Sequence, residues 1–185
     1  TYEMEVNAFA SSIPMYLDYI IMDCCLMGGV EVAYELKGVC GKLIFSQTEV
    51  LADGLCNYTN VIGRLLNSSE PDLKGLCEDA YTHYDSQSGG YRSLTISMID
   101  CAKLGPLAEA CAKLFSDYRG KMAIVNPSSV QHYFRYNKHW FYDLEDILVQ
   151  SGASEEDLKS FRTAMSRCVL YNEASPSFFS VPIKT

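Results

Sequence analysis

The sequence lacks several patterns that would assign it to a common class of protein. It has no run of Lys and Arg, and its formal net charge of -8 argues against nucleic acid as the main partner. No apolar stretch is long enough to cross a membrane. The cysteines form no Cys-x-x-Cys pair and no Asp-x-Asp-x-Asp-Gly loop is present, so neither a structural zinc site nor a standard calcium loop is indicated. We therefore expect no metal site and no cofactor, although this does not decide whether calcium is required.

The composition is that of a folded domain with a sizeable core. The chain has 185 residues, of which 48% are hydrophobic and 21% are charged. Its acidic balance suits cationic substrates. Most of the eight cysteines stand where a small apolar residue would fit, so we expect reduced thiols in the core. A disulfide between the adjacent Cys24 and Cys25 is disfavoured by disulfide geometry.

The sequence is organised around one stretch, residues 17–36. Residues 20–22 form an apolar run that predicts a strand covered on both faces, and two adjacent glycines then allow a sharp turn. The apolar residues after the turn recur at helical spacing, which predicts a strand–turn–helix unit. Asp23, Cys24 and Cys25 follow the strand directly, at the edge where open α/β sheets bind their ligands.

The remaining elements continue this α/β pattern and then change character. Residues 41–46 predict a second strand, parallel to the first through a right-handed crossover, so that the loop 47–54 lies at the same edge. A change to an aromatic, irregular stretch places a subdomain boundary near Met122. Further helices are expected at residues 3–12, 58–66, 69–84, 100–118, 143–150 and 154–167, and further strands at 93–99, 168–172 and 178–183. Pro106 favours a start of the helix at 100–118 near Gly105, and Gly120 closes it. Ser69 is the expected cap of the helix at 69–84, and Ser154 opens a capping box.

Cys25 is the residue best placed for nucleophilic chemistry. A cysteine attacks as its thiolate, and it needs an exposed position with a base nearby, such as the end of a strand leading into a helix. The other interpretation is a small buried residue beside a tight turn. The base is harder to find, because no histidine of the chain stands in a pattern typical of a catalytic base. The three histidines are His83, His132 and His139.

Two carboxylates are expected beside this thiol. Asp23 lies two residues before Cys25, and Asp53 lies in the loop after the neighbouring strand. Converging carboxylates are costly to desolvate unless they are paired, so they would favour a cationic Lys or Arg side chain over a neutral one. The alternatives are a strand-end cap for Asp23 and an Asp-Gly turn for Asp53.

Residues 23–36, Asp-Cys-Cys-Leu-Met-Gly-Gly-Val-Glu-Val-Ala-Tyr-Glu-Leu, resemble the nucleophile segment of the clostripain family of cysteine endopeptidases. The usual form is Asp-Ala-Cys-Leu-Met, two small residues and Val-Glu-Val-Ala-Tyr. Cys25 falls on the nucleophile and Cys24 replaces the usual Ala. The resemblance extends more loosely over residues 3–118, and it implies the fold of the related caspases, legumains and gingipains. That fold is a caspase-like α/β/α sandwich with a mostly parallel central sheet, here with a smaller C-terminal α+β appendage.

The resemblance also implies a function. Family members cleave after Arg or Lys, their acidic pocket matches Asp23 and Asp53, and the backbone amide of Cys25 would donate to an oxyanion. Their catalytic histidine precedes the nucleophile in a His-Gly segment that is absent here, so we expect it on an N-terminal chain of the same precursor, separated by proteolytic processing. Residues 1–122 would then be the nucleophile-bearing half of the peptidase domain and 123–185 a C-terminal subdomain. A bacterial protein, secreted or at the cell surface, is implied.

Three other functions are compatible with the same residues. The first is a catalytically inactive protein that binds peptides on this fold, and the second is a thiol sensor that uses Cys24 and Cys25. The third is a structural subunit in which Cys25 does not react.

Overall fold

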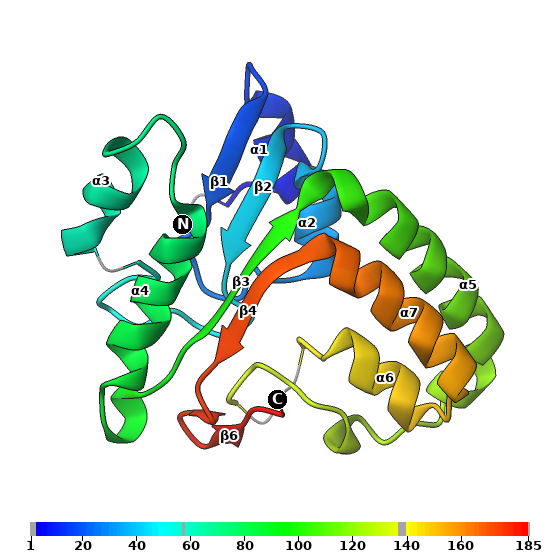
Figure 1. Ribbon diagram of the computed structural model, residues 1–185. Coiled ribbons are helices and arrows are strands. Elements are labelled where there is room, and N and C mark those ends of the chain that lie inside the picture. The colour runs from blue at the N-terminus through cyan, green and yellow to red at the C-terminus, as the bar shows by residue number, and fades with distance from the viewer. Residues whose placement is uncertain (1–2, 57, 137–139, 185) are drawn as a thin grey trace.

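The computed structural model describes residues 3–56, 58–136 and 140–184, and these build a four-stranded sheet with helices on both faces (Figure 1). The strand order is β1 (Leu17–Ile21), β2 (Cys40–Phe45), β3 (Thr95–Asp100) and β4 (Val169–Ala174). β1 and β2 are parallel, as predicted, whereas β3 is antiparallel to both of its neighbours. The α/β class is therefore confirmed, in a mixed sheet in which β1, β2 and β4 point one way and β3 points the other.

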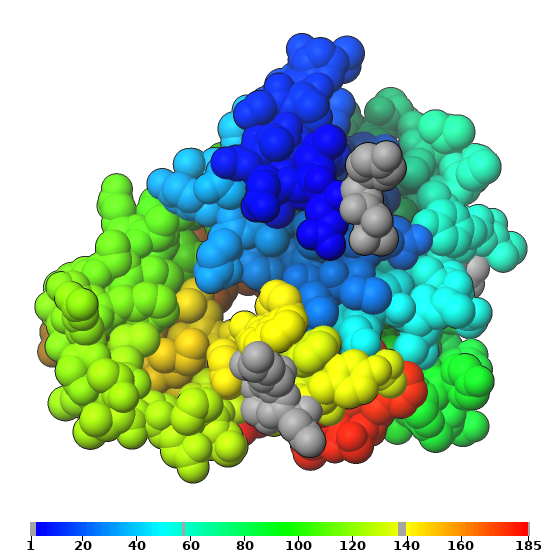
Figure 2. All heavy atoms as spheres, turned by 180° about the vertical axis from the view of Figure 1, so that it is seen from behind, coloured from blue at the N-terminus to red at the C-terminus, as the bar shows by residue number. Residues whose placement is uncertain are grey.

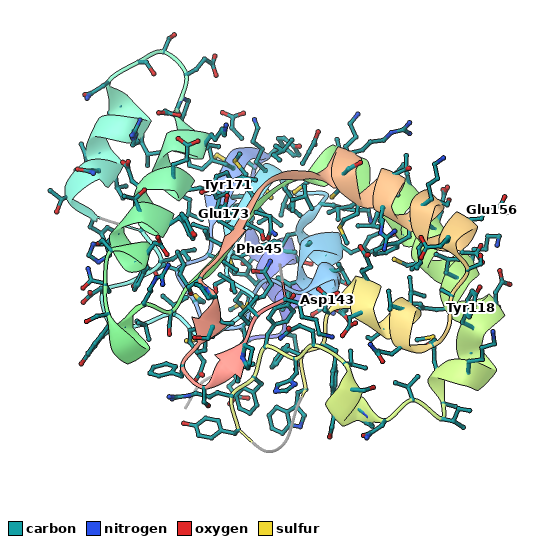
Figure 3. The ribbon with its side chains drawn as sticks, turned by 60° about the horizontal axis from the view of Figure 1, so that its bottom comes forward. Phe45, Tyr118, Asp143, Glu156, Tyr171 and Glu173 are labelled. Atoms are coloured by element: carbon teal, nitrogen blue, oxygen red, sulfur yellow. The ribbon has the colours of Figure 1, made fainter. Side chains whose placement is uncertain are left out.

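The helices cover the sheet as two layers. One face carries α1 (Val6–Ser12), α2 (Val30–Leu36), α5 (Leu104–Met122), α6 (Leu144–Gln150) and α7 (Glu155–Cys168), and the other carries α3 (Tyr58–Leu66) and α4 (Leu73–Asp85). Alternation along β2 sends Leu43 and Phe45 into the first layer and Ile44 into the second. Figure 3 shows Phe45 near the middle of the molecule. Short 3₁₀ turns lie at Gly89–Tyr91, Cys101–Lys103 and Pro127–Ser129.

The chain after Met122 shares the sheet and the core with the chain before it. β4 pairs with β3 from Thr95↔Ala174 to Ile99↔Val169, and Phe161 of α7 is buried in the same cluster as Leu36 of α2. β4 is a short strand with polar side chains, and its sequence gives no sign of its pairing with β3. The fold therefore joins both sides of the expected boundary in one sandwich.

A smaller cluster lies at the end of the chain. The two-residue strands β5 (Ser177–Phe178) and β6 (Val181–Pro182) form a hairpin, where the sequence predicted a single strand. Gln131 donates from Nε2 to the Pro182 carbonyl at 3.1 Å. In Figure 2 a yellow segment accordingly lies beside the red C-terminal end.

Local signals explain most helix boundaries. Ser154 caps α7 by accepting from the Asp157 N–H at 3.2 Å, as the capping-box pattern predicts. Asp72 rather than the expected Ser69 caps α4, accepting from the Gly75 N–H at 2.9 Å. Gly120 does not end α5, which continues to Met122. Within the described part of the chain, no helix combines the length and apolar content that crossing a bilayer requires.

Candidate active site

The turn between β1 and α2 is fastened to the loop that follows β2. The Leu26 N–H donates to the Thr48 carbonyl at 2.8 Å, and the Gly28 N–H donates to the Ser46 carbonyl at 2.7 Å. Leu26 has a φ of 61°, in the left-handed region that ordinary side chains seldom adopt. These two bonds hold the strained turn in place, so the position of the turn depends on the loop after β2.

Cys25 lies on this turn and is exposed. Its Sγ lies 3.2 Å from the Val50 backbone nitrogen and 3.7 Å from the Val50 carbonyl oxygen. The sulfur is therefore both open to solvent and held by the loop after β2, as a nucleophile would need to be. Cys24 is also exposed, whereas strand alternation continued beyond β1 would turn it away from Cys25 and into the packing. The alternation does not apply to Cys24, because β1 ends at Ile21.

The other thiols lie in different surroundings. Five of them, namely Cys40, Cys56, Cys77, Cys101 and Cys168, are buried, and Cys111 is half-buried. Burial raises the pKa of Cys56, which also faces the charge of Asp23, and that of Cys77 to about 12. These two thiols therefore stay protonated at neutral pH and are poor nucleophiles. The expectation of reduced core cysteines is confirmed for the five buried ones.

Asp23 follows β1 and holds the chain around Gly54. Its Oδ1 accepts from the Leu55 N–H at 2.6 Å, and its Oδ2 accepts from the Tyr58 hydroxyl. Ionising Tyr58 would put a phenolate beside this carboxylate, so the hydrogen bond to Asp23 raises the pKa of Tyr58 to about 12. Gly54 has a φ of 85°, and a Cβ there would lie 2.9 Å from Asp23 Oδ2. A glycine thus allows the loop to pass close over the carboxylate.

Asp53 lies in the same loop, but its side chain is engaged elsewhere. The carboxylate is 72% exposed, and its Oδ2 lies 3.6 Å from Nε2 of His83 on α4. The next residue of that helix, Tyr84, donates its hydroxyl to the Gly54 carbonyl at 2.6 Å. The structure thus brings Asp23 to the loop that carries Asp53, while the Asp53 carboxylate faces α4.

Sequence reasoning missed the residues that support this loop. The contact of His83 with Asp53 has no local signal in the sequence, because the two positions lie on different elements. Glu49 forms a 2.8 Å ion pair with Nε of Arg135, whose guanidinium also lies 4.7 Å from the centre of the Phe179 ring. Arg135, from the C-terminal part of the chain, therefore helps to hold Glu49, the residue next to Val50, in place.

The histidines that the structure describes make contacts away from Cys25. His83 lies beside Asp53, and Nδ1 of His132 lies 3.4 Å from the Val130 carbonyl oxygen. His139 lies outside the described residues. Among those that are described, no group of three or more His, Cys, Asp or Glu side chains could hold a metal ion.

One cavity on the α3 side of the sheet belongs to the scaffold. It has a volume of about 480 Å³ and lies between α3 and α4. Arg64 crosses it, donating to Asp72 at 2.6 Å and to Asp79 at 2.9 Å. Both carboxylates are thus paired with a guanidinium that joins α3 to α4, and the lining does not include Cys25.

Replacing Gly28 with alanine is expected to displace the turn. A Cβ at this position would lie 2.7 Å from the Gln47 nitrogen and 2.8 Å from the Ser46 carbonyl carbon, both backbone atoms that cannot swing aside. We expect Gly28→Ala to lower the free energy of unfolding by about 1–3 kcal/mol, the usual cost of overpacking. Chemical denaturation measures this, with Gly38→Ala as the control because its Cβ would meet nothing within 4 Å. Equal midpoints for the two variants would show that the approach of the turn to the loop is not tight.

An α/β/α sandwich with an exposed cysteine at the carboxyl end of a strand has the architecture of the caspase-like cysteine peptidases. A family model described as the clostripain family matches residues 4–182, and the chain belongs to this family. This confirms the resemblance read from residues 23–36. No protein of the curated set matches the chain significantly.

Solved structures of the family show the same fold. An inactive zymogen of a C11 protease from Parabacteroides distasonis is 30% identical, with a TM-score of 0.85 over 98% of this chain and 54% of its own. A clostripain from Bacteroides thetaiotaomicron, in complex with a peptide inhibitor, is 28% identical, with a TM-score of 0.86 over 100% and 82%. A secreted C11 cysteine protease from the same organism is 27% identical, with a TM-score of 0.86 over 100% and 52%. The chain thus spans about half the length of the first and third of these proteins.

Proposed function

We propose that this chain is the nucleophile-bearing part of a cysteine endopeptidase that cleaves after Arg or Lys. The observation that carries the proposal is the exposed Cys25 on the turn after β1, two residues from a carboxylate that is fixed to the neighbouring loop. Family membership supports the peptidase class. The inhibitor complex of a relative supports the view that this fold binds peptides.

In the proposed reaction the Cys25 thiolate attacks the carbonyl carbon of the scissile bond. The carbonyl oxygen becomes an oxyanion, to which the Cys25 N–H would donate a hydrogen bond. Collapse of this intermediate breaks the C–N bond, and a histidine acting as general acid protonates the leaving amine. Water then hydrolyses the acyl-enzyme, which releases the new carboxylate and restores the thiol.

Specificity in this proposal comes from Asp23 and Asp53. Asp23 is already oriented by the Leu55 N–H and the Tyr58 hydroxyl, so its carboxylate needs little ordering when a cationic side chain arrives. The Asp53 side chain would rotate away from His83 and pair with the same cationic side chain of the substrate, since Asp53 is mostly exposed in its present position. The inhibitor bound by the relative from Bacteroides thetaiotaomicron carries the letters VLTK, which end in lysine.

The catalytic histidine would come from a preceding chain of the same precursor. Within the described sheet β1 is an edge strand, paired on one side with β2. Its open side presents unpaired backbone groups that could accept another strand. The greater length of two relatives and the inactive zymogen of one of them support this arrangement and its activation by proteolysis. By the same likeness to a relative described as secreted, we propose a secreted or cell-surface protein.

Hydrolysis of short fluorogenic peptides tests the proposal. The full-length gene product is incubated with peptides that differ only in a final Arg, Lys, Asp or Leu, with calcium or with EDTA. Cleavage after Arg or Lys alone is expected, and the EDTA arm shows whether calcium is required. Absence of cleavage, together with a Cys25 that does not react with an arginyl chloromethylketone, would instead identify a catalytically inactive peptide-binding protein.

A further inference from the structure

The side chain of Thr95 is a buried centre of hydrogen bonds at the start of β3. Its Oγ1 lies 3.0 Å from the Gln47 nitrogen and 3.0 Å from the Thr48 nitrogen. It also lies 2.9 Å from Ser46 Oγ and 3.1 Å from Thr48 Oγ1. Thr95 is only 3% exposed, so water does not compete for these bonds. A single hydroxyl thus contacts three consecutive residues of the loop after β2.

The end of the β2–β3 ladder explains why a side-chain hydrogen-bond acceptor is needed at this position. The ladder between β2 and β3 ends with Phe45 opposite Ser97, and two more residues of regular pairing would set residue 47 against residue 95. The chain leaves the ladder at this point, so the N–H groups of Gln47 and Thr48 have no strand partner in this register. Leaving buried N–H groups unpaired is costly, and the Thr95 hydroxyl accepts from both. Ser46 Oγ, 3.2 Å from the Thr48 nitrogen, is a second acceptor for the Thr48 N–H.

The same three residues hold the turn that bears Cys25. The Ser46 and Thr48 carbonyls accept from the N–H groups of Gly28 and Leu26, at 2.7 Å and 2.8 Å. Two residues beyond Thr48, the Val50 nitrogen lies 3.2 Å from Cys25 Sγ. A continuous set of short contacts therefore runs from Thr95 through the loop to the residues that follow Cys25 and to its sulfur.

We propose that Thr95 is a positioning residue for Cys25. Its hydroxyl fixes residues 46–48, and the loop that they begin fixes the position of the Cys25 sulfur. Thr95 itself contacts neither the sulfur nor the substrate. The catalytic consequence rests on the proposed peptidase function, whereas the effect on the chemical reactivity of Cys25 does not. A misplacement of about 1 Å can cost an enzyme on the order of 100-fold in rate, so a small shift of this loop would be visible in kcat.

The test replaces Thr95 with valine, which has nearly the same shape and lacks the hydroxyl. Thr95→Ser keeps the hydroxyl and should rescue the defect. Ser175→Ala is the matched control, because Ser175 is also buried and accepts from the N–H of Leu94 beside Thr95. Within the described residues its hydroxyl bonds to Leu94 and Ser177, neither of which belongs to the loop. All variants are made in the full-length protein on a Cys24→Ala background. Alkylation at this turn then reports on Cys25 and not on the adjacent Cys24.

Two quantities are measured for each variant, namely kcat and KM for a basic peptide and the rate at which iodoacetamide modifies Cys25. We expect Thr95→Val to lower kcat at least about tenfold, with KM within about threefold. We expect its alkylation rate to differ more than threefold from that of the parent, while Thr95→Ser and Ser175→Ala stay within threefold in both measurements. If Thr95→Val does not fold, Thr95→Ala leaves room for a water, and its kcat should fall at least threefold.

The outcomes separate the two proposals. A parent protein that hydrolyses no peptide contradicts the peptidase function, and the alkylation rates then decide the role of Thr95. A folded Thr95→Val protein with the kcat and alkylation rate of the parent overturns the positioning role. Equal losses in Thr95→Val and Ser175→Ala would overturn it too, because they would show a general loss of stability.

Discussion

Replacing Cys25 with alanine should abolish cleavage of basic peptides, lowering kcat/KM by at least about 10⁴-fold. The acyl-enzyme route needs the Cys25 sulfur to form its covalent bond with the substrate. Nucleophile variants of proteases keep only the weak residual catalysis that binding and oxyanion contacts provide. Initial rates with the Arg and Lys peptides measure the loss, with circular dichroism confirming the fold.

Cys24→Ala is the matched control for this substitution. Cys24 is also an exposed thiol on the same turn, and the resemblance of residues 23–36 to the family pattern places alanine at this position. Cys24→Ala should therefore keep kcat/KM within about threefold of the parent, an interval that corresponds to about 0.7 kcal/mol. Persistent cleavage by Cys25→Ala, or its loss in Cys24→Ala, would assign the nucleophile to a different sulfur.

The strand–turn–helix unit around Cys25 could be predicted because its signals are local. An apolar run, a pair of glycines and a change to helical spacing lie within residues 17–36, and the structure places β1, the turn and α2 there. The bounds of α3 were predicted for the same reason, since its apolar residues recur at helical spacing. Each of these signals lies within a short segment of sequence. It can be recognised without knowing which helix or strand the segment packs against.

The pairing of distant segments could not be predicted in this way. The direction of β3 depends on a connection of about fifty residues through α3 and α4, and its apolar run would suit a parallel or an antiparallel neighbour equally well. β4 has three exposed or half-exposed polar positions and was read as part of an appendage. Side chains from opposite ends of the chain fill the same core, which only the folded structure reveals.

The same difference between local signals and long-range contacts applies to the candidate site. Cys25 and Asp23 could be selected because they stand together after a strand. The ion pair of Glu49 with Arg135 and the contacts of Thr95 with Thr48 join positions that are far apart in sequence and lie in no common motif. The chemical groups of the site were therefore visible in the sequence, whereas the residues that hold them were not.

Asp23→Asn should remove most of the preference for basic peptides while leaving the fold intact. Asparagine has nearly the same shape, its carbonyl can still accept from the Leu55 N–H, and its amide can face the Tyr58 oxygen. The variant therefore loses the charge and keeps the hydrogen bonds. Losing one partner of a close charge pair costs about 2–5 kcal/mol. We expect kcat/KM for Arg and Lys peptides to fall by about 100-fold, which corresponds to about 2.7 kcal/mol.

Tyr58→Phe separates the charge of Asp23 from its orientation. It removes the hydroxyl that donates to Asp23 Oδ2 and keeps the negative charge in place. Because the Leu55 N–H still holds the other carboxylate oxygen, we expect kcat/KM for basic peptides to stay within about fivefold of the parent, a change of about 1 kcal/mol. Equal losses in Tyr58→Phe and Asp23→Asn would mean that Asp23 acts by holding the loop at Gly54. A large loss confined to Asp23→Asn and to basic peptides would mean that its charge binds the substrate.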